Sequence, residues 1–285
     1  ITREIMSDSN KFKLAGVMGM PIYQSRSPIL HNYWLAKYGI KGAYGHFPVE
    51  LKNLEGAIRG LSSLGLAGCN ITLPHKVHAM KMMDHIDPLA QRMGAINCIV
   101  VQEDGALHGF NHDGFGYIQS VKDAKPDWRA DAGPILVLGA GGAARAIVLS
   151  LVDAGAKEIR LVNRTISKAQ ELTSGVESIV KVFDWSERNE CMRDSAMLIN
   201  TTSQGMYGQP PLEVQLDALP LTALVSDAVY IPLETPLLEK ARLRGNTTVN
   251  GLGMLLNQAR PAFKLWFGVM PEITAELKEA VLATF

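Results

Sequence analysis

Residues 135–147, ILVLGAGGAARAI, decide the fold, because an apolar run leads directly into a glycine-rich turn and an alanine-rich helix pattern. Gly139, Gly141 and Ala144 have the G-x-G-x-x-A spacing of a dinucleotide-binding turn. The first glycine permits a tight turn, the second lets the backbone approach a pyrophosphate, and the third small residue keeps helix and strand close together. With the strand pattern KEIRLVNR (157–164) that follows, the segment predicts a strand–helix–strand unit.

The end of the second strand of this unit indicates which dinucleotide is bound. An NAD site carries Asp or Glu about 20 residues beyond the glycine turn, where it holds a ribose hydroxyl. This chain instead has Asn163, Arg164 and Thr165, followed by Lys168. Because a guanidinium suits a 2′-phosphate, the sequence predicts NADP. The alternative is that Arg164 is a solvated residue at a helix start.

Outward from this unit, apolar runs alternate with helix patterns along nearly the whole chain, which predicts an α/β fold. The segment KDAKPDWRADAGP (122–134) is the most linker-like stretch, since it mixes proline, glycine and charges. We therefore expect a first domain at 1–112, a dinucleotide-type domain at 113–250 and C-terminal helices at 251–285. Strand patterns lie at 14–20, 44–50, 65–73, 178–185, 196–203 and 223–230, with two more in 95–110, and helix patterns at 29–40, 51–65 and 74–86.

Composition excludes several classes of protein. The 285 residues include 28 Lys+Arg and 28 Asp+Glu, so no excess charge indicates a nucleic-acid or membrane-surface partner. No apolar run approaches the ~20 residues of a membrane span, and the polar stretch 1–13 lacks the apolar core of a signal peptide. Three widely spaced cysteines predict no disulfide framework and favour the cytoplasm. Three histidines, at 75, 78 and 85, lack any metal-binding motif, so no metal is expected.

Two hydroxyl residues precede the first helix pattern. We expect Ser27 to be the N-cap, with Pro28 in the first turn. Together with Ser25, it forms a small anion site at a helix N-terminus that suits a carboxylate. Taken alone, Ser27 is consistent with a simple cap.

A second polar cluster follows the strand pattern 65–73. Asn70 and Thr72 share one face at its end, and we expect Pro74 to start a helix with Lys76 in its first turn. Lys76 is either an exposed surface lysine or an acid–base group. Asp113 lies at the predicted domain junction, where ligand sites are favoured, although a helix cap also explains it.

The chain resembles the shikimate dehydrogenase family over nearly its whole length. The motifs that carry the resemblance are GMPIYQSRSPILHN, NITLPHK, GAINCI, NHDGFG, VLGAGGAARA, NRTISKA, NTTSQGM, DAVYIPLETPLL and GLGMLLNQA. The resemblance implies an N-terminal α/β substrate domain, a Rossmann-type NADP-binding domain, a cleft between them, and a C-terminal helix that returns to the substrate domain. It also implies NADP-dependent interconversion of 3-dehydroshikimate and shikimate, in aromatic amino acid and chorismate biosynthesis.

Carried over by position, the resemblance also assigns roles to residues. Lys76 and Asp113 match the catalytic pair. The substrate-binding positions are Ser25, Ser27 and Tyr230 for the carboxylate, and Asn70, Thr72, Asn97 and Gln258 for the ring. The cofactor-binding positions are Gly139, Ala140, Gly141, Gly142, Ala143, Ala144, Asn163, Arg164, Thr165 and Lys168, with Thr201, Met206, Gly251 and Met254 bordering the nicotinamide.

Two departures leave the natural substrate open. Cys98 and His112 stand where the family usually has threonine. The chain is therefore either a shikimate dehydrogenase or a paralogue that acts on quinate or another carboxylated cyclic polyol. A methylenetetrahydrofolate dehydrogenase is disfavoured, because that family has tyrosine where this chain has Thr72. A catalytically silent NADP sensor is disfavoured because both Lys76 and Asp113 are present. A monomer and a homodimer are both compatible with the sequence.

Overall fold

The structure, a computed structural model, describes residues 11–285, and its contacts divide the chain into two units. Unit 1 runs to His112 and also contains Gln258–Phe285, whereas unit 2 is Asp113–Asn257. The sequence placed the second boundary at residue 250; the division lies instead within helix α8 (Leu252–Phe267). Residues 1–10, most of the polar stretch compared above with a signal peptide, lie outside the described residues.

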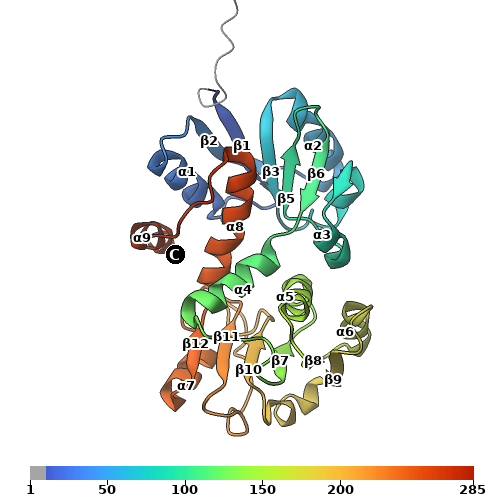
Figure 1. The fold of residues 1–285 in the computed structure, drawn as a ribbon, viewed down its shortest axis with the longest axis vertical. Helices are drawn as coiled ribbons and strands as arrows, with labels where there is room; N and C mark the ends of the chain where they lie inside the picture. Colours follow the sequence, from blue (N-terminus) through green and yellow to red (C-terminus); the bar gives the residue numbers. More distant parts are fainter. Residues whose placement is uncertain (1–10) are drawn as a thin grey trace, which may run out of the picture. The chain divides into compact units, whose positions relative to one another are not determined.

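Unit 1 is built on a mixed six-stranded sheet in the order β2-β1-β3-β5-β6-β4 (Figure 1). Neighbours β2, β1 and β3 run parallel, whereas β5 is antiparallel to both β3 and β6. The strands are β1 (Lys13–Gly19), β2 (Gly42–Pro48), β3 (Leu66–Ile71), β4 (His85–Ile86), β5 (Cys98–Val101) and β6 (Leu107–Phe110). The α-helices are α1 (Ser27–Lys37), α2 (Leu54–Ser63), α3 (Pro88–Met93) and α9 (Ala275–Leu282), with 3₁₀ turns η2 (Leu51–Asn53) and η3 (His78–Met82).

The core of unit 1 follows the expected helix periodicity. Leu54, Ile58 and Leu61 form the buried stripe of α2 and pack in one cluster with Cys69 and Ile71 of β3. The C-terminal segment belongs to this unit as well, since α9 contacts α1. The predicted strands and amphipathic helix therefore assemble as one sheet with helices packed on it.

Unit 2 is an all-parallel six-stranded sheet in the order β12-β11-β10-β7-β8-β9. Counted from the first strand of the unit, this is the Rossmann order 6-5-4-1-2-3, with the order reversing at β7. The strands are β7 (Ile135–Leu138), β8 (Ile159–Asn163), β9 (Val180–Asp184), β10 (Met197–Asn200), β11 (Leu224–Asp227) and β12 (Thr247–Val249). The other elements are α4 (Asp113–Ala124), α5 (Gly142–Asp153), α6 (Ile166–Thr173) and α7 (Pro236–Arg244), with η4 (Trp185–Glu187) and η5 (Glu190–Met192).

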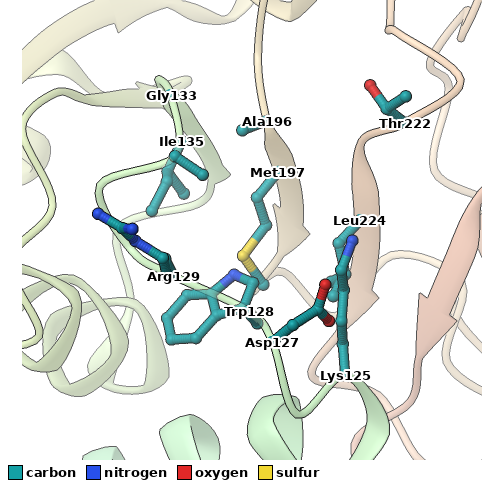
Figure 2. Close-up of a pocket in the computed structure, with 11 residues that line it drawn as sticks. Lys125, Asp127, Trp128, Arg129, Gly133, Ile135, Ala196, Met197, Thr222 and Leu224 are labelled. Atoms are coloured by element: carbon teal, nitrogen blue, oxygen red, sulfur yellow. The ribbon is translucent and has the colours of Figure 1, made fainter.

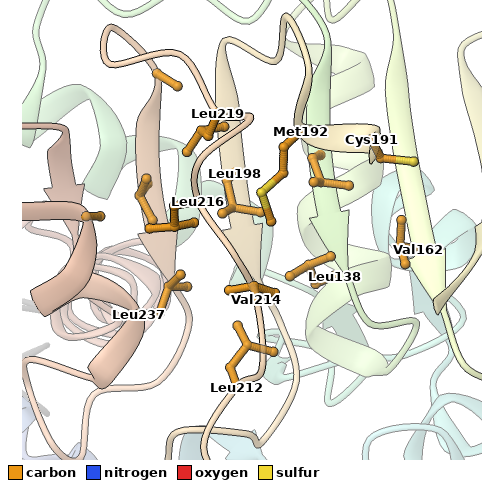
Figure 3. Close-up of a cluster of buried hydrophobic side chains, with 14 of the residues drawn as sticks. Leu138, Val162, Cys191, Met192, Leu198, Leu212, Val214, Leu216, Leu219 and Leu237 are labelled. Atoms are coloured by element: carbon orange, nitrogen blue, oxygen red, sulfur yellow. The ribbon is translucent and has the colours of Figure 1, made fainter. Parts of the chain in front are cut away.

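The sheet of unit 2 is buried on both faces, as parallel sheets usually are. All four residues of β7 are buried, so its side chains alternate between two cores. On one face, Leu138 and Leu198 pack under the segment that carries Val214 and Leu216 (Figure 3). This packing fixes the strands whose carboxyl ends carry the predicted cofactor residues.

Two local predictions were wrong. Residues 74–77 form turns rather than a helix, and a short 3₁₀ helix follows at His78–Met82. The His75 side chain is fully buried and its Nε2 lies 2.7 Å from the carbonyl oxygen of Val49, while Ile96 N–H donates to the carbonyl of Lys76. These contacts with distant segments hold the chain in the turn.

The predicted N-cap was also one residue too late. Helix α1 begins at Ser27 itself, Arg26 is the N-cap, and no side chain caps the helix. Ser25 Oγ instead accepts a hydrogen bond from Ser27 N–H at 3.4 Å. Pro28 does lie in the first turn, as predicted.

Candidate functional site

The glycine turn lies between β7 and α5. Gly139 has a φ of +102°, and a Cβ there would lie 2.8 Å from Thr201 Oγ1, so only glycine fits this turn. Gly141 and Gly142 are exposed, and a Cβ at either would meet open space. Ala144 is fully buried and holds α5 against the strand. The turn therefore leaves its exposed backbone and the N-terminus of α5 accessible to a pyrophosphate.

The loop after β8 lies next to this turn, because Val162 pairs with Leu138 in the parallel register. Asn163 Nδ2 donates to the carbonyl oxygen of Thr165 at 2.8 Å, which shapes the loop before α6 begins. Arg164 and Lys168 are exposed. Arg164 in this loop and Lys168 in the first turn of α6 are two cations, and the loop has no carboxylate. This composition fits a ribose 2′-phosphate, which agrees with NADP rather than NAD.

The loops after β10 and β11 are tied together by a buried carboxylate. Asp227 is 1% exposed and accepts hydrogen bonds from Asn200 Nδ2 at 3.0 Å, Val229 N at 3.0 Å and Thr235 Oγ1 at 2.7 Å. Burial raises the pKa of Asp227, and these three donors act in the opposite direction. The network holds both loops at the carboxyl edge of the sheet.

The residues predicted to border the nicotinamide all belong to unit 2. Thr201 follows β10 and donates to the carbonyl of Leu138 at 2.7 Å, beside the glycine turn. Gly251 follows β12, and a Cβ there would lie 2.2 Å from the carbonyl oxygen of Ala228. Met206 is 40% exposed in the loop after β10, and Met254 is half-buried in α8. In an open α/β sheet this edge, where the strand order reverses, is where ligands bind.

A pocket of about 300 Å³ lies at the other edge of the same sheet (Figure 2). Ile135, Met197 and Leu224 are the first residues of their strands, so the pocket is at the amino ends. Trp128 and Arg129 from the loop after α4 also line it. None of the predicted cofactor residues lies in this pocket.

In unit 1, four of the predicted substrate residues form two hydrogen-bonded pairs. Ser25 Oγ donates to Ser27 Oγ at 3.3 Å. Asn70 Nδ2 donates to the carbonyl oxygen of Asn97 at 2.9 Å, and both asparagines are buried. Tyr44, which the sequence did not single out, donates its hydroxyl to Asn70 Oδ1 at 2.6 Å. Only the folded pairing of β2, β1 and β3 brings Tyr44 to Asn70.

The remaining predicted substrate and catalytic residues are distributed over both units. Thr72 follows β3, and its N–H donates to the carbonyl of Met18 at 3.0 Å. Lys76 is half-buried in the turn after it, and Gln258 is half-buried in α8, all within unit 1. Asp113 is the first residue of α4, and Tyr230 follows β11, both half-buried in unit 2.

The two departures from the family pattern have different surroundings. Cys98 is fully buried, and burial raises the pKa of its thiol, so it packs as a small protonated side chain. His112 N–H donates to Asn97 Oδ1 at 3.0 Å, and its ring stacks on Phe110 with centroids 5.9 Å apart. His112 is thus bonded to a predicted substrate residue through its backbone.

Within residues 11–285, no helix is long and apolar enough to cross a membrane. No group of three or more His, Cys, Asp or Glu side chains in the described part of the chain is placed to hold a metal ion.

An all-parallel sheet in Rossmann order and a glycine turn, with Arg164 after the next strand, together define a Rossmann-type dinucleotide-binding domain. Three family models match the chain: shikimate dehydrogenase substrate binding domain at residues 17–99, shikimate / quinate 5-dehydrogenase at 123–207, and shikimate 5′-dehydrogenase C-terminal domain at 251–282. The chain belongs to the shikimate dehydrogenase family.

Individual relatives agree with this assignment. Shikimate dehydrogenase (NADP(+)) of Paramagnetospirillum magneticum is 49% identical, over 96% of this chain and 100% of its own. A crystal structure of a shikimate dehydrogenase in complex with NADP⁺ is 35% identical, with a TM-score of 0.86 and 95% of each chain covered. Quinate dehydrogenase from Corynebacterium glutamicum, in complex with NAD, is 27% identical, with a TM-score of 0.88 over 96% of this chain and 100% of that one.

Proposed function

We propose that this protein interconverts 3-dehydroshikimate and shikimate with NADP as the hydride carrier. The observation that carries the proposal is the two hydrogen-bonded pairs Ser25–Ser27 and Asn70–Asn97, in a chain 49% identical to an enzyme named shikimate dehydrogenase (NADP(+)). These hydroxyls and amides suit a small ring that carries a carboxylate and hydroxyl groups. The reaction serves aromatic amino acid and chorismate biosynthesis.

Each polar side chain has a role in binding the ring. Ser25 and Ser27, at the N-terminus of α1, donate to the carboxylate, with Tyr230 as a further donor. Asn70, Thr72, Asn97 and Gln258 bind the ring hydroxyls and fix which carbon reacts. Holding the reacting carbon in one orientation lowers the entropic cost of reaching the transition state.

Two charged residues handle the proton. Lys76 Nζ gives the proton to the carbonyl oxygen when the ketone is reduced, and takes it from the hydroxyl when the alcohol is oxidised. Asp113 hydrogen-bonds the part of the substrate that reacts, and so orients the groups between which the proton moves. When bound, NADPH would supply the hydride for reduction of the ketone, and NADP⁺ would accept the hydride in oxidation of the alcohol.

The cofactor is held by the carboxyl edge of the sheet in unit 2. The backbone of residues 139–144 binds the pyrophosphate, and Asn163, Arg164, Thr165 and Lys168 bind the adenosine 2′-phosphate side. Thr201, Met206, Gly251 and Met254 border the nicotinamide. We place the enzyme in the cytoplasm, as a monomer or homodimer.

Quinate is the second candidate substrate. His112 and Cys98 stand at positions where the family usually has threonine, and His112 is bonded to the predicted substrate residue Asn97. NADP-linked oxidation of shikimate and quinate, assayed side by side, separates the two. Higher kcat/KM for shikimate supports the proposal, whereas turnover of quinate alone assigns the chain to the alternative.

A further inference from the structure

We propose that Tyr44 is a positioning residue for substrate, because its hydroxyl holds the side-chain amide of Asn70, which is itself hydrogen-bonded to Asn97. This inference rests on the proposed function in one respect, which is that Asn70 and Asn97 bind the ring. Tyr44 lies in β2, in none of the segments that carry the predicted site residues.

A short chain of hydrogen bonds runs from Tyr44 through Asn70 to Asn97. Tyr44 donates to Asn70 Oδ1 at 2.6 Å, and Asn70 Nδ2 donates to the carbonyl oxygen of Asn97 at 2.9 Å. Hydrogen bonds linked in this way polarise and strengthen one another in a buried site.

This chain also settles which way the Asn70 amide faces. Its oxygen accepts from Tyr44, and one of its two N–H groups is bonded to Asn97. Asn70 therefore has its second N–H left to offer, so it acts towards a ligand mainly as a donor. A ring hydroxyl that meets Asn70 must accept this hydrogen bond.

Helix α1 fixes Tyr44 from two sides. The ring of His31 stacks on the Tyr44 ring, with centroids 4.1 Å apart and planes at 4°. Asn32 Nδ2 donates to the Tyr44 carbonyl at 2.9 Å, and Asn32 Oδ1 accepts from Tyr44 N–H at 3.0 Å. Both the ring and the backbone of Tyr44 are thereby held, so the hydroxyl position is set before a ligand arrives.

Burial keeps the Tyr44 hydroxyl a donor. The residue is 4% exposed, and burial raises the pKa of the phenol well above its ordinary value, with the nearby thiols of Cys69 and Cys98 acting in the same direction. The phenol therefore stays protonated at any pH where the enzyme works. Removing the hydroxyl leaves the buried Asn70 Oδ1 without its hydrogen-bond donor.

Tyr44→Phe is the test, because it deletes one oxygen and keeps the ring stacked on His31. We expect KM for shikimate to rise about tenfold, the effect of one unmade buried hydrogen bond, while KM for NADP stays unchanged. The matched control is Tyr117→Phe, which removes a hydroxyl from a side chain that is 1% exposed in α4 of unit 2. The control should leave KM for shikimate unchanged.

A double-mutant cycle with Asn70→Ala shows whether Tyr44 acts through Asn70. The effect of Tyr44→Phe on KM for shikimate should largely disappear when Asn70 is already alanine. A folded Tyr44→Phe enzyme with wild-type KM for shikimate overturns the proposal, even if its Tm has fallen. So does an undiminished effect in the Asn70→Ala background. If Tyr44→Phe does not fold, Tyr44→Met serves in both measurements. Wild-type turnover of shikimate is measured in the same series, so a failure of the proposed function is seen separately.

Discussion

The ring of His31 stacks face to face on the ring of Tyr44, with centroids 4.1 Å apart and planes inclined by 4°. His31 is fully buried, also contacts the rings of Trp34, Phe263 and Trp266, and has no hydrogen-bond partner in the described chain for either ring nitrogen. Burial lowers the pKa of His31 from 6.5 to about 3. The packing of this aromatic cluster therefore requires a neutral imidazole.

This requirement predicts a loss of stability in mild acid. Between about pH 6.5 and 3, the unfolded chain binds a proton at His31 that the folded chain does not, so stability falls as pH falls through this range. His31→Phe removes this titrating group. When the pH is lowered from 6.5 to 5, the free energy of unfolding of wild type should therefore fall by about 1.5 kcal/mol more than that of the variant. Urea unfolding at both pH values measures it, with exposed His78→Phe as control. Parallel pH dependences of wild type and His31→Phe would contradict the prediction.

Arg164 should set the preference for NADP over NAD. It is exposed in a loop without carboxylates, just before the helix that carries Lys168, so it can make a charge-assisted contact with the 2′-phosphate. Arg164→Ala should weaken NADP binding about 10- to 100-fold and leave NAD binding unchanged. Fluorescence titration with both cofactors gives the two Kd values, and Arg164→Lys, which keeps the charge, should lose less. An unchanged NADP/NAD ratio in Arg164→Ala would sink the assignment.

His112 should lower activity with shikimate. Its backbone is bonded to Asn97, and its ring is much larger than the threonine usual in the family. His112→Thr should therefore raise kcat/KM for shikimate several-fold, with a different effect on quinate. Steady-state kinetics on both substrates test this. If neither substrate responds, the ring only packs against Phe110, and His112 gives no ground for doubting the substrate.

The sequence predicted unit 2 well because its signals are local. The turn needs a positive φ and close packing at Gly139, which only glycine allows, and the strand pattern before it is a continuous apolar run. The short strands β4 and β12 were missed, since two or three residues carry no periodicity. The linker-like stretch 122–134 also begins with the last turn of α4, because a charged, exposed helix end resembles a loop in sequence.

The candidate site was only partly predictable. Motifs indicated Ser25, Ser27 and Asn70, but nothing in residues 42–48 marked Tyr44, whose role depends on how β2 and β3 pair with β1. The segment after Pro74 was predicted as a helix because its composition permits one. Burial of His75 against Val49, a contact between distant residues, decides otherwise.

The most direct test of the proposed mechanism is kcat for NADP-linked oxidation of shikimate by wild type and Lys76→Ala. Wild type should oxidise shikimate. Lys76→Ala should lower kcat by roughly 10²–10⁴, because a positioned acid–base group is lost. Kd for NADP should stay the same, because the cofactor-binding residues are unchanged. Asp113→Asn should also be severe, and the double variant should be far less than additive. Near-wild-type kcat in Lys76→Ala would contradict the account.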